Sequence, residues 1–255
     1  MNEETEKHVV ISYYNEHVQN KLSDYIHVNA RIEEAWRTLL KFAPAAPKRI
    51  LEVGCGVGSI CARMGKKWPD ALITGIDISD DSITLAQKLF STDKISFRSG
   101  VLTPETFDEK FDLIVFMDVY EHIAVHDRPD VHAALKRILN NKGRIILSVP
   151  TPHYLKWCLV HRPETMQPVD EHISLEVIGR LASDTGTEVM LYQIKNVWNT
   201  GDYAHVVLEK NDDFQAAFFH PKPVSGMQRA RRILNKVKYK LGSLLRTLKV
   251  RNKLR

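Results

Sequence analysis

The chain has 255 residues, of which 44% are hydrophobic and 26% are charged. This composition is ordinary for a soluble globular protein, and the length is sufficient for one α/β domain with extensions. The three cysteines (Cys55, Cys61 and Cys158) are odd in number and form no C-x-x-C pair. They argue against a disulfide-built secreted fold and favour a reducing, cytoplasmic location. The acidic, polar N-terminus predicts no signal peptide, and no apolar run is long enough to span a membrane.

The net charge of +5 is unevenly distributed. Residues 222–255 contain 12 Lys and Arg and no acidic residue, which leaves 24 basic against 31 acidic residues in 1–221. An acidic body with a strongly basic C-terminal segment is therefore expected. Such a segment suits anionic partners, but the acidic body carries no basic and aromatic platform of the kind that binds nucleic acid.

Residues 1–46 are expected to form a helical arm. Six apolar residues recur at helical spacing on one face, before Pro44 and Pro47 end the pattern: Val28, Ile32, Ala35, Trp36, Leu39 and Leu40. Two interpretations of this arm stay open. It is a packing helix, or it is a lid over a bound ligand with Arg31 reaching a ligand carboxylate.

Residues 47–210 are expected to form the main domain, beginning with a strand at 50–53. Three alternating glycines follow it (Gly54, Gly56 and Gly58), and Ser59 stands where a helix N-cap is expected. A strand that turns through glycines into a helix exposes backbone N–H groups and lets a ligand approach closely. The spacing differs from the dinucleotide fingerprint G-x-G-x-x-G, and an acid, Glu52, lies inside the strand.

A second strand, at 71–78, ends in Asp77, and Ser79 is expected to cap the helix at 82–89. In nucleotide-binding α/β folds an acid at the end of strand two accepts hydrogen bonds from ribose hydroxyls. Ile78 would then flank an adenine. The alternative role for Asp77 is helix capping, which Ser79 and Asp80 already provide, so the ribose role is favoured.

Further strands are expected at 95–100, 111–117 and 144–149, with a helix at 131–139 that ends at 141–143. Strand–helix alternation predicts a doubly wound, mostly parallel seven-stranded sheet with its ligand at the carboxyl ends of the strands. Residues 151–172 are expected to be an irregular insertion on the substrate side, rich in His, Pro and aromatic residues. A helix at 175–183 and strands at 188–197 and 205–209 complete the domain.

The glycine turn resembles motif I of the class I S-adenosylmethionine-dependent methyltransferases. Residues 111–123 and the stretch 26–31 resemble the ubiquinone-pathway O-methyltransferases, and the resemblance covers roughly residues 25–210. Many of these enzymes carry Gly-Asp after strand three, whereas this chain has Gly100-Val101, so adenine recognition would fall to backbone groups near Val101 and Leu102. The full set of expected cofactor-binding residues is Arg31, Glu52, Gly54, Gly56, Gly58, Asp77, Ile78, Val101, Leu102 and Met117.

A carboxylate–imidazole cluster is expected after strand four, because Asp118, Glu121 and His122 would share one face of a helical turn. Oxygen and imidazole ligands suit Mg²⁺, Mn²⁺ or Zn²⁺, and His172 would be a fourth ligand, as in metal-dependent relatives. The alternative is that Glu121 and His122 order the helix without a metal and that His172 is structural. For removal of a proton from a hydroxyl acceptor, the candidate bases are His122, His153, His161, His172 and Asp118, of which His122, His172 and Asp118 are favoured.

The expected activity is methyl transfer from S-adenosylmethionine to a hydroxyl of a small molecule, a sugar or a lipid-linked compound. The motif Asn-Pro-Pro-Tyr, typical of amino-group methylation, is absent after strand four, which favours oxygen. The alternatives are an RNA methyltransferase, and a non-catalytic accessory protein that binds the cofactor and docks at membranes.

The C-terminal region divides into a linker, 211–225, and a basic amphipathic tail, 226–255. The apolar stripe of the tail comprises Ile233, Leu234, Val237, Leu241, Leu244, Leu245 and Leu248. This pattern favours docking to an anionic membrane, which would make the protein peripheral at the inner face of the membrane. The alternative is that the stripe packs on the protein's own body or on a partner chain.

Overall fold

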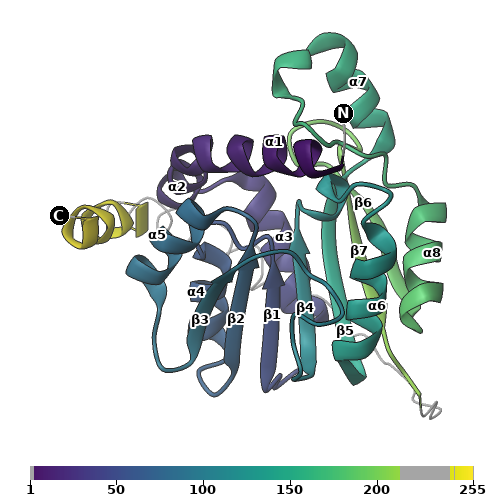
Figure 1. Cartoon of the computed structure of the whole chain (residues 1–255), viewed down its shortest axis with the longest axis horizontal. Coiled ribbons are helices and arrows are strands. Elements are labelled where there is room, and N and C mark those ends of the chain that lie inside the picture. Colours follow the sequence, from purple (N-terminus) through teal and green to yellow (C-terminus); the bar gives the residue numbers. More distant parts are fainter. Residues whose placement is uncertain (1–2, 213–241, 244, 255) are drawn as a thin grey trace, which may run out of the picture.

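A computed structural model of the chain describes residues 3–212, 242–243 and 245–254. Three helices, α1 (Glu3–Glu16), α2 (Val18–His27) and α3 (Ala30–Phe42), precede the first strand (Figure 1). The predicted linker from 213 onward and the tail up to 241 lie outside the described residues. Within the described part, no helix is both long and apolar enough to cross a membrane.

The body is built on a seven-stranded sheet with the order β3-β2-β1-β4-β5-β7-β6. Its strands are β1 (Arg49–Val53), β2 (Leu72–Asp77), β3 (Ile95–Ser99), β4 (Phe111–Met117), β5 (Leu139–Pro150), β6 (Glu188–Lys195) and β7 (Tyr203–Glu209). Strands β1 to β5 pair in parallel, whereas β7 is antiparallel to both β5 and β6. The predicted doubly wound, mostly parallel fold is therefore confirmed.

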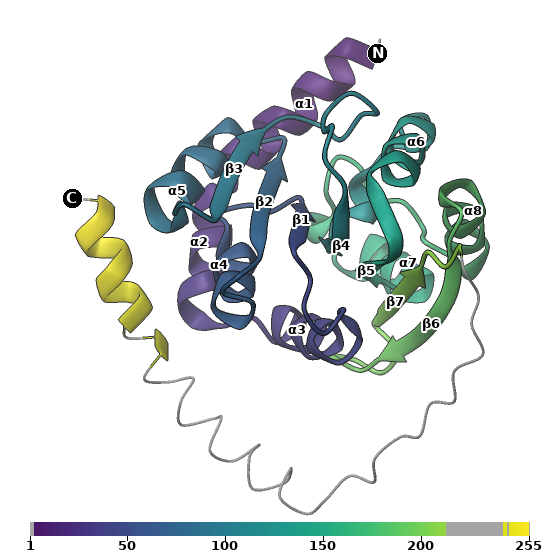
Figure 2. The ribbon, with the colours of Figure 1, turned by 90° about the horizontal axis from the view of Figure 1, so that it is seen from below.

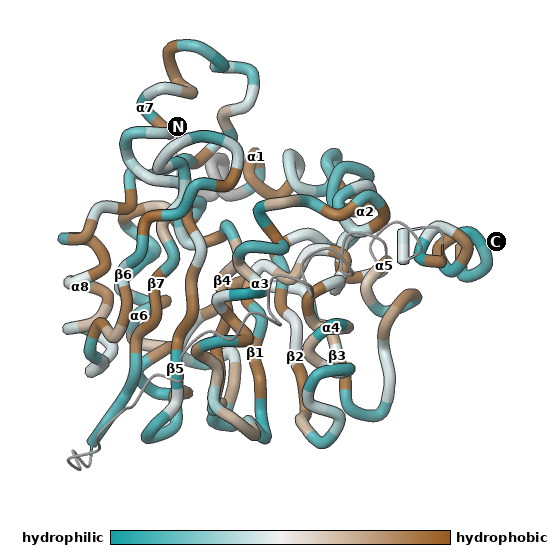
Figure 3. The backbone as a smooth tube through the Cα atoms, turned by 180° about the vertical axis from the view of Figure 1, so that it is seen from behind, coloured by the Kyte–Doolittle hydropathy of each residue, from teal (hydrophilic) through white to brown (hydrophobic). Residues whose placement is uncertain are grey.

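Helices cover both faces of the sheet (Figure 2). Helices α3, α4 (Ser59–Lys67) and α5 (Asp80–Phe90) pack on one face, and α6 (Arg128–Ile138) and α8 (Leu175–Thr185) pack on the other. Successive strand residues point to opposite faces, so Leu113 belongs to the first core and Ile114 to the second. Burial on both sides explains why the central strands are nearly continuous apolar runs (Figure 3).

The glycine turn between β1 and α4 has a left-handed backbone. Gly54, Gly56 and Gly58 have φ angles of 69°, 51° and 79°. The helix cap is Gly58, and Ser59 is the first residue of α4, so the expected Ser59 cap is wrong. A Cβ at Gly58 would lie 2.6 Å from the ring of Phe97, so both backbone conformation and space require glycine there.

The start of β5 differs from the sequence expectation. The helix was expected to end at 141–143, but α6 ends at Ile138 and β5 begins at once with Leu139, which pairs with Phe111. The register then shifts before Arg144 pairs with Leu113, and residues 140–143 accommodate a bulge in which Lys142 has a φ of 63°. Because Leu139 is buried, β5 begins at this residue, although the residues that follow it are polar.

The insertion after β5 was predicted to be irregular, but its first part is helical. It forms α7 (Pro152–His161) and then the short 3-10 helix η2 (Pro163–Thr165). Thr151 accepts a hydrogen bond from the Tyr154 N–H, and Pro152 occupies the first turn, where it needs no donor. These two residues start a helix in a segment whose aromatic and proline content suggested a loop.

The N-terminal arm bends between α2 and α3. Val28 has a φ of 65°, and the Asn29 side chain caps α3 by accepting a hydrogen bond from the Arg31 N–H. Ala35 and Leu39 are buried as expected, but Val28 lies outside the helix and Leu40 is 42% exposed. The bend lets α1 lie across the carboxyl ends of the parallel strands (Figure 1).

Candidate functional site

Asp77 lies at the carboxyl end of β2, as the sequence predicts, and its carboxylate is buried beside the glycine turn. Its Oδ2 accepts a hydrogen bond of 2.7 Å from the Gly56 N–H, and its Oδ1 accepts one of 2.9 Å from the Ser79 N–H. The Lys21 ammonium of α2 is 3.4 Å from Oδ2. Two backbone donors and one cation therefore hold a carboxylate at the position where the fold presents a ligand.

Glu52 is also buried, one strand away in β1. Burial raises the pKa of Glu52 to about 8, although a hydrogen bond with the Cys61 thiol opposes the shift. No hydrogen-bond partner of its Oε2 is found in the described part of the chain. A buried carboxyl with a free oxygen is stabilised by a nearby cation or donor.

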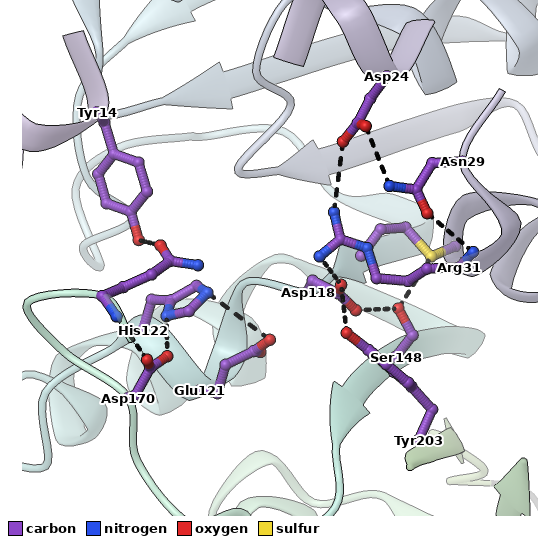
Figure 4. Close-up of polar contacts among 12 residues, drawn as sticks. Tyr14, Asp24, Asn29, Arg31, Asp118, Glu121, His122, Ser148, Asp170 and Tyr203 are labelled. Carbon is purple, nitrogen blue, oxygen red and sulfur yellow. Dashed lines mark hydrogen bonds and ion pairs between the residues drawn. The ribbon is translucent and has the colours of Figure 1, made fainter. Parts of the chain in front are cut away.

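Arg31 and Asp118 form the centre of a second cluster (Figure 4). Arg31 Nη1 is 2.6 Å from Asp118 Oδ2, and its Nη2 is 3.7 Å from Asp24. Ser148 donates a 3.0 Å hydrogen bond to Asp118 Oδ1, and the Tyr203 hydroxyl is 3.4 Å from Oδ2. The carboxylate of Asp118 is therefore committed to protein donors.

Asp118 has a φ of 56°, which is uncommon for a residue other than glycine. Its N–H donates to the Ser148 carbonyl at 2.9 Å, and the surrounding donors hold the side chain in place. Such backbone strain is concentrated at functional sites and persists only where the neighbouring structure imposes it.

His122 lies at the end of the 3-10 helix η1 (Tyr120–His122) and is fixed from both sides (Figure 4). Its Nδ1 is 2.7 Å from the Val169 carbonyl and 3.1 Å from Asp170 Oδ1, while its Nε2 is 3.7 Å from Glu121 Oε1. Burial lowers the pKa of His122, but the Glu121 and Asp170 carboxylates outweigh it and raise the pKa above its usual value.

Glu121 is 1% exposed, and its Oε2 lacks a hydrogen-bond partner within the residues that the structure describes. Burial raises the pKa of this carboxyl above its ordinary value, and the neighbouring His122 opposes the shift. The pair thus offers one ring nitrogen and one carboxyl oxygen that no strong protein contact uses.

A cavity of about 440 Å³ adjoins both His122 and Arg31. Its walls come from η1, the end of β5, α7, the segment after η2, and the loop before β7. The lining residues are Arg31, Glu121, His122, Pro150, Tyr154, Leu155, Cys158, Arg162, Thr165, Met166, Gln167, Asp170, Trp198, Asn199 and Tyr203. A concave site that combines aromatic side chains with charged and polar groups is typical of small-molecule binding.

The remaining expected cofactor residues occupy varied environments. Leu102 is buried, Val101 is 38% exposed, and Ile78 and Met117 are partly buried. The Met117 sulfur is 3.7 Å from the Ser148 hydroxyl. Their contacts with a cofactor stay predictions, as does the contact of Arg31 with a cofactor carboxylate.

The structure corrects the expected metal site. Asp118 binds Arg31, His122 directs Nδ1 toward Val169 and Asp170, and His172 is exposed. Among the described residues, no three His, Cys, Asp or Glu side chains are arranged to hold a metal ion. Helical spacing suggested convergence, but η1 is too short and Asp118 lies before it, in a left-handed conformation.

Four residues of the site were missing from the sequence-based set: Tyr14, Lys21, Asp170 and Tyr203. Tyr14 donates a hydrogen bond of 2.9 Å to Gln167, and the Gln167 N–H donates one of 2.6 Å to Asp170. Each of these residues reaches the site from an element distant in sequence. Local spacing carries no signal for such contacts, except that Asp170 precedes the predicted ligand His172 closely.

Residues 13–190 match the methyltransferase domain family. This match covers more than half of the chain, so the protein belongs to that family. The confirmed fold and the glycine turn agree with the membership.

Two curated relatives are O-methyltransferases. The chain is 31% identical over 126 residues to a ubiquinone biosynthesis O-methyltransferase from Pasteurella multocida, covering 44% of this chain and 50% of the relative. It is 38% identical over 144 residues to a malonyl-[acyl-carrier protein] O-methyltransferase from Priestia megaterium, covering 52% of this chain and 51% of the relative. The chain spans about half the length of these curated relatives.

Solved structures support the fold. Magnesium protoporphyrin IX methyltransferase from Synechocystis PCC 6803, with bound SAH, has a TM-score of 0.62 at 17% identity and covers 80% of this chain and 100% of its own. The 1,6-didemethyltoxoflavin-N1-methyltransferase of Burkholderia thailandensis has a TM-score of 0.63 at 15% identity, covering 83% of this chain and 92% of its own. The fold therefore occurs with acceptors of different chemistry.

Proposed function

We propose that the protein is an S-adenosylmethionine-dependent methyltransferase that methylates an oxygen of a small or lipid-linked acceptor. The observation that carries the cofactor assignment is the buried Asp77 carboxylate at the end of β2, fixed by the glycine turn that precedes α4. This arrangement suits ribose hydroxyls, because a carboxylate held by backbone donors accepts further hydrogen bonds without reorganising.

The residues present fit the cofactor. Asp77 would hold the ribose, the glycine backbone would lie against the amino-acid end, and the free Oε2 of the buried Glu52 carboxyl would accept a hydrogen bond there. Arg31 keeps donors beyond those engaged by Asp118 and Asp24, because a guanidinium carries five N–H groups. When bound, the cofactor supplies an activated methyl group on a sulfonium.

The acceptor is proposed to occupy the cavity beside His122. Tyr154 and Trp198 offer aromatic walls, and Arg162 offers a cation at the α7 side. Both curated relatives described above act on oxygen by their names, which supports an oxygen acceptor here.

His122 is the proposed general base. Its Nδ1–H donates to the Val169 carbonyl and Asp170 orients the ring, so the neutral form has its lone pair on Nε2. That nitrogen would take the acceptor hydroxyl proton. Asp118, whose oxygens face Arg31, Ser148 and Tyr203, is proposed to position Arg31 and not to act as a base.

Calorimetric titration with S-adenosylmethionine and S-adenosylhomocysteine tests the cofactor assignment. Asp77→Asn should weaken binding at least about tenfold, because charge-assisted hydrogen bonds contribute roughly 1.5–3 kcal/mol each. Asp80→Asn, an exposed acid three residues further on, is the matched control and should bind normally. Equal affinity in wild type and Asp77→Asn, with both folded, would refute the site.

The same preparation separates cofactor from acceptor functions. His122→Asn should retain S-adenosylhomocysteine affinity and lose methyl transfer from labelled cofactor to acceptors in a cell extract. Mass analysis of the labelled product then identifies the acceptor atom. A product labelled on nitrogen would contradict the oxygen assignment and leave the cofactor assignment intact.

A further inference from the structure

The C-terminal helix of the described residues, 245–254, packs on the body through a face rich in cations. Val250 is 6% exposed and joins the core that α5 covers. Arg246 lies 5.7 Å from the Tyr25 ring centroid and Lys249 lies 4.5 Å from that of Phe90. These contacts fasten the helix beside α2 and α5, at one end of the molecule (Figure 1).

Polar contacts reinforce this orientation. The Lys253 ammonium donates a hydrogen bond of 3.0 Å to the Leu89 carbonyl, and the Ser243 hydroxyl donates one of 2.6 Å to the Ile26 carbonyl. The body-facing side of the helix is therefore occupied by Arg246, Lys249, Val250 and Lys253.

The leucines of the predicted apolar stripe that the structure describes point away from the body. Leu245 is 67% exposed and Leu248 is 48% exposed. Leu248 lies two residues before Val250, and about 100° of rotation per residue places the two on nearly opposite sides of an α-helix. Leu241 and Leu244, the other nearby members of the stripe, lie outside the described residues.

The charge of the C-terminal segment indicates which kind of surface the face with Leu245 and Leu248 binds. Residues 222–255 contain 12 basic residues and no acid, and Arg251 is exposed on the described helix. A nucleic acid would engage the cations without using exposed leucines, and an ordinary protein interface does not exclude acids over a whole segment. Anionic lipid uses both features, because acyl chains accept leucines and headgroup phosphates accept Lys and Arg.

We propose that the face carrying Leu245 and Leu248 docks on an anionic lipid surface. The opposite face stays bound to α2 and α5, so docking holds the folded domain at the membrane without unfolding the helix from the body. Arg251, which is exposed on the described helix, contacts the headgroups through its long side chain. The proposal concerns location and is independent of the acceptor and of the cofactor site.

Flotation of the full chain with vesicles tests the proposal. Equal mixtures of phosphatidylglycerol and phosphatidylcholine should carry the protein at low salt, and phosphatidylcholine alone should not. The double variant Leu245→Gln/Leu248→Gln should reduce the partition coefficient at least about tenfold, because two leucines lose their apolar contact with lipid. Leu175→Gln, another exposed leucine, is the matched control and should float like wild type.

Two further measurements distinguish other occupants. Arg251→Glu should lower the fraction of protein that floats with the vesicles. It should also make that fraction less dependent on salt concentration, because one headgroup contact is lost. The proposal is wrong if wild type fails to float with anionic vesicles, or if the double leucine variant floats equally well. A dimer in solution that Leu245→Gln/Leu248→Gln converts to monomer would assign the face to a second copy and also overturn it. All variants should bind S-adenosylhomocysteine like wild type, which separates this test from that of the proposed function.

Discussion

His205, on β7, shows how a single buried imidazole affects the molecule. It is 1% exposed, its Nδ1 is 2.6 Å from the Thr38 hydroxyl of α3, and no partner for its Nε2 exists in the described structure. Burial lowers the pKa of His205 to about 4, with a smaller contribution from Lys195. The folded protein therefore holds a neutral imidazole where the unfolded chain would accept a proton.

This shift predicts a loss of stability in acid. Between pH of about 6.5 and 4 the unfolded chain binds the proton and the folded protein does not, so the free energy of unfolding falls as pH falls. Between pH 7 and 5 the contribution lost should be on the order of 2 kcal/mol. Urea unfolding at several pH values measures it, with His205→Gln as a variant that cannot titrate. Parallel pH profiles for wild type and His205→Gln would contradict the expectation.

At the scale of elements, a buried hydrogen-bond chain ties η1 to α6 and α8. The Tyr120 hydroxyl is 2.7 Å from His132 Nε2, and His132 Nδ1 is 2.8 Å from Asp184 Oδ2. The groups are satisfied when Tyr120 donates to Nε2 and Nδ1–H donates to Asp184. The hydrogen bond from His132 is the main cause that lowers the pKa of Asp184. This hydrogen-bond chain anchors η1, the 3-10 helix that carries Glu121 and His122.

Breaking this hydrogen-bond chain should destabilise the protein, and the effects of breaking it at two of its residues should not add. His132→Leu leaves the buried Tyr120 hydroxyl unpaired and should cost about 1–3 kcal/mol. Tyr120→Phe in the same background should cost little further, so the double-mutant cycle should show coupling of about 1 kcal/mol. Arg180→Ala, at an exposed residue that contacts Asp184 from outside, is the control with a small effect. Additive single effects in denaturant unfolding would contradict the anchoring role.

At the scale of the whole molecule, the N-terminal arm joins two halves of the site. Asn15 accepts a hydrogen bond of 2.7 Å from Ser79 on the β2 side, whereas Tyr14 bonds to Gln167 on the insertion side. Lys21 pairs with Asp77 between them. The arm thus spans the carboxyl ends of the strands, where both proposed ligands would bind, which supports the interpretation of the arm as a lid.

Ligand binding should therefore protect the arm from hydrogen exchange. A ligand that binds only the closed form lowers the population in which α1 and α2 open, by mass action. S-adenosylhomocysteine should slow exchange in α1 and α2 severalfold and leave β7, deep in the sheet, unchanged. Unaltered exchange in α1 and α2 at saturating ligand would show that the arm is only a packing element.

Local patterns in the sequence were enough to predict the parallel sheet, the glycine turn and the position of Asp77. These features are encoded locally, because apolar runs favour strands and left-handed turns favour glycine. Strand β4 coincides with its predicted bounds, 111–117, and Ser79 caps α5 as expected. The proposed activity follows mainly from this local part of the sequence.

Which side chains contact one another depends on the packing of elements that lie far apart in the sequence. Lys21 lies 56 positions from Asp77, and Arg31 lies far from Asp118, so no spacing rule pairs them. The expected metal cluster does not form for the same reason. Donors from α3, β5 and β7 bind the Asp118 carboxylate. The Val169 carbonyl, in the loop before α8, binds His122. The sequence also left open which face of the C-terminal helix contacts the body, and in the structure this is the face with Val250, next to Tyr25 of α2 and Phe90 of α5.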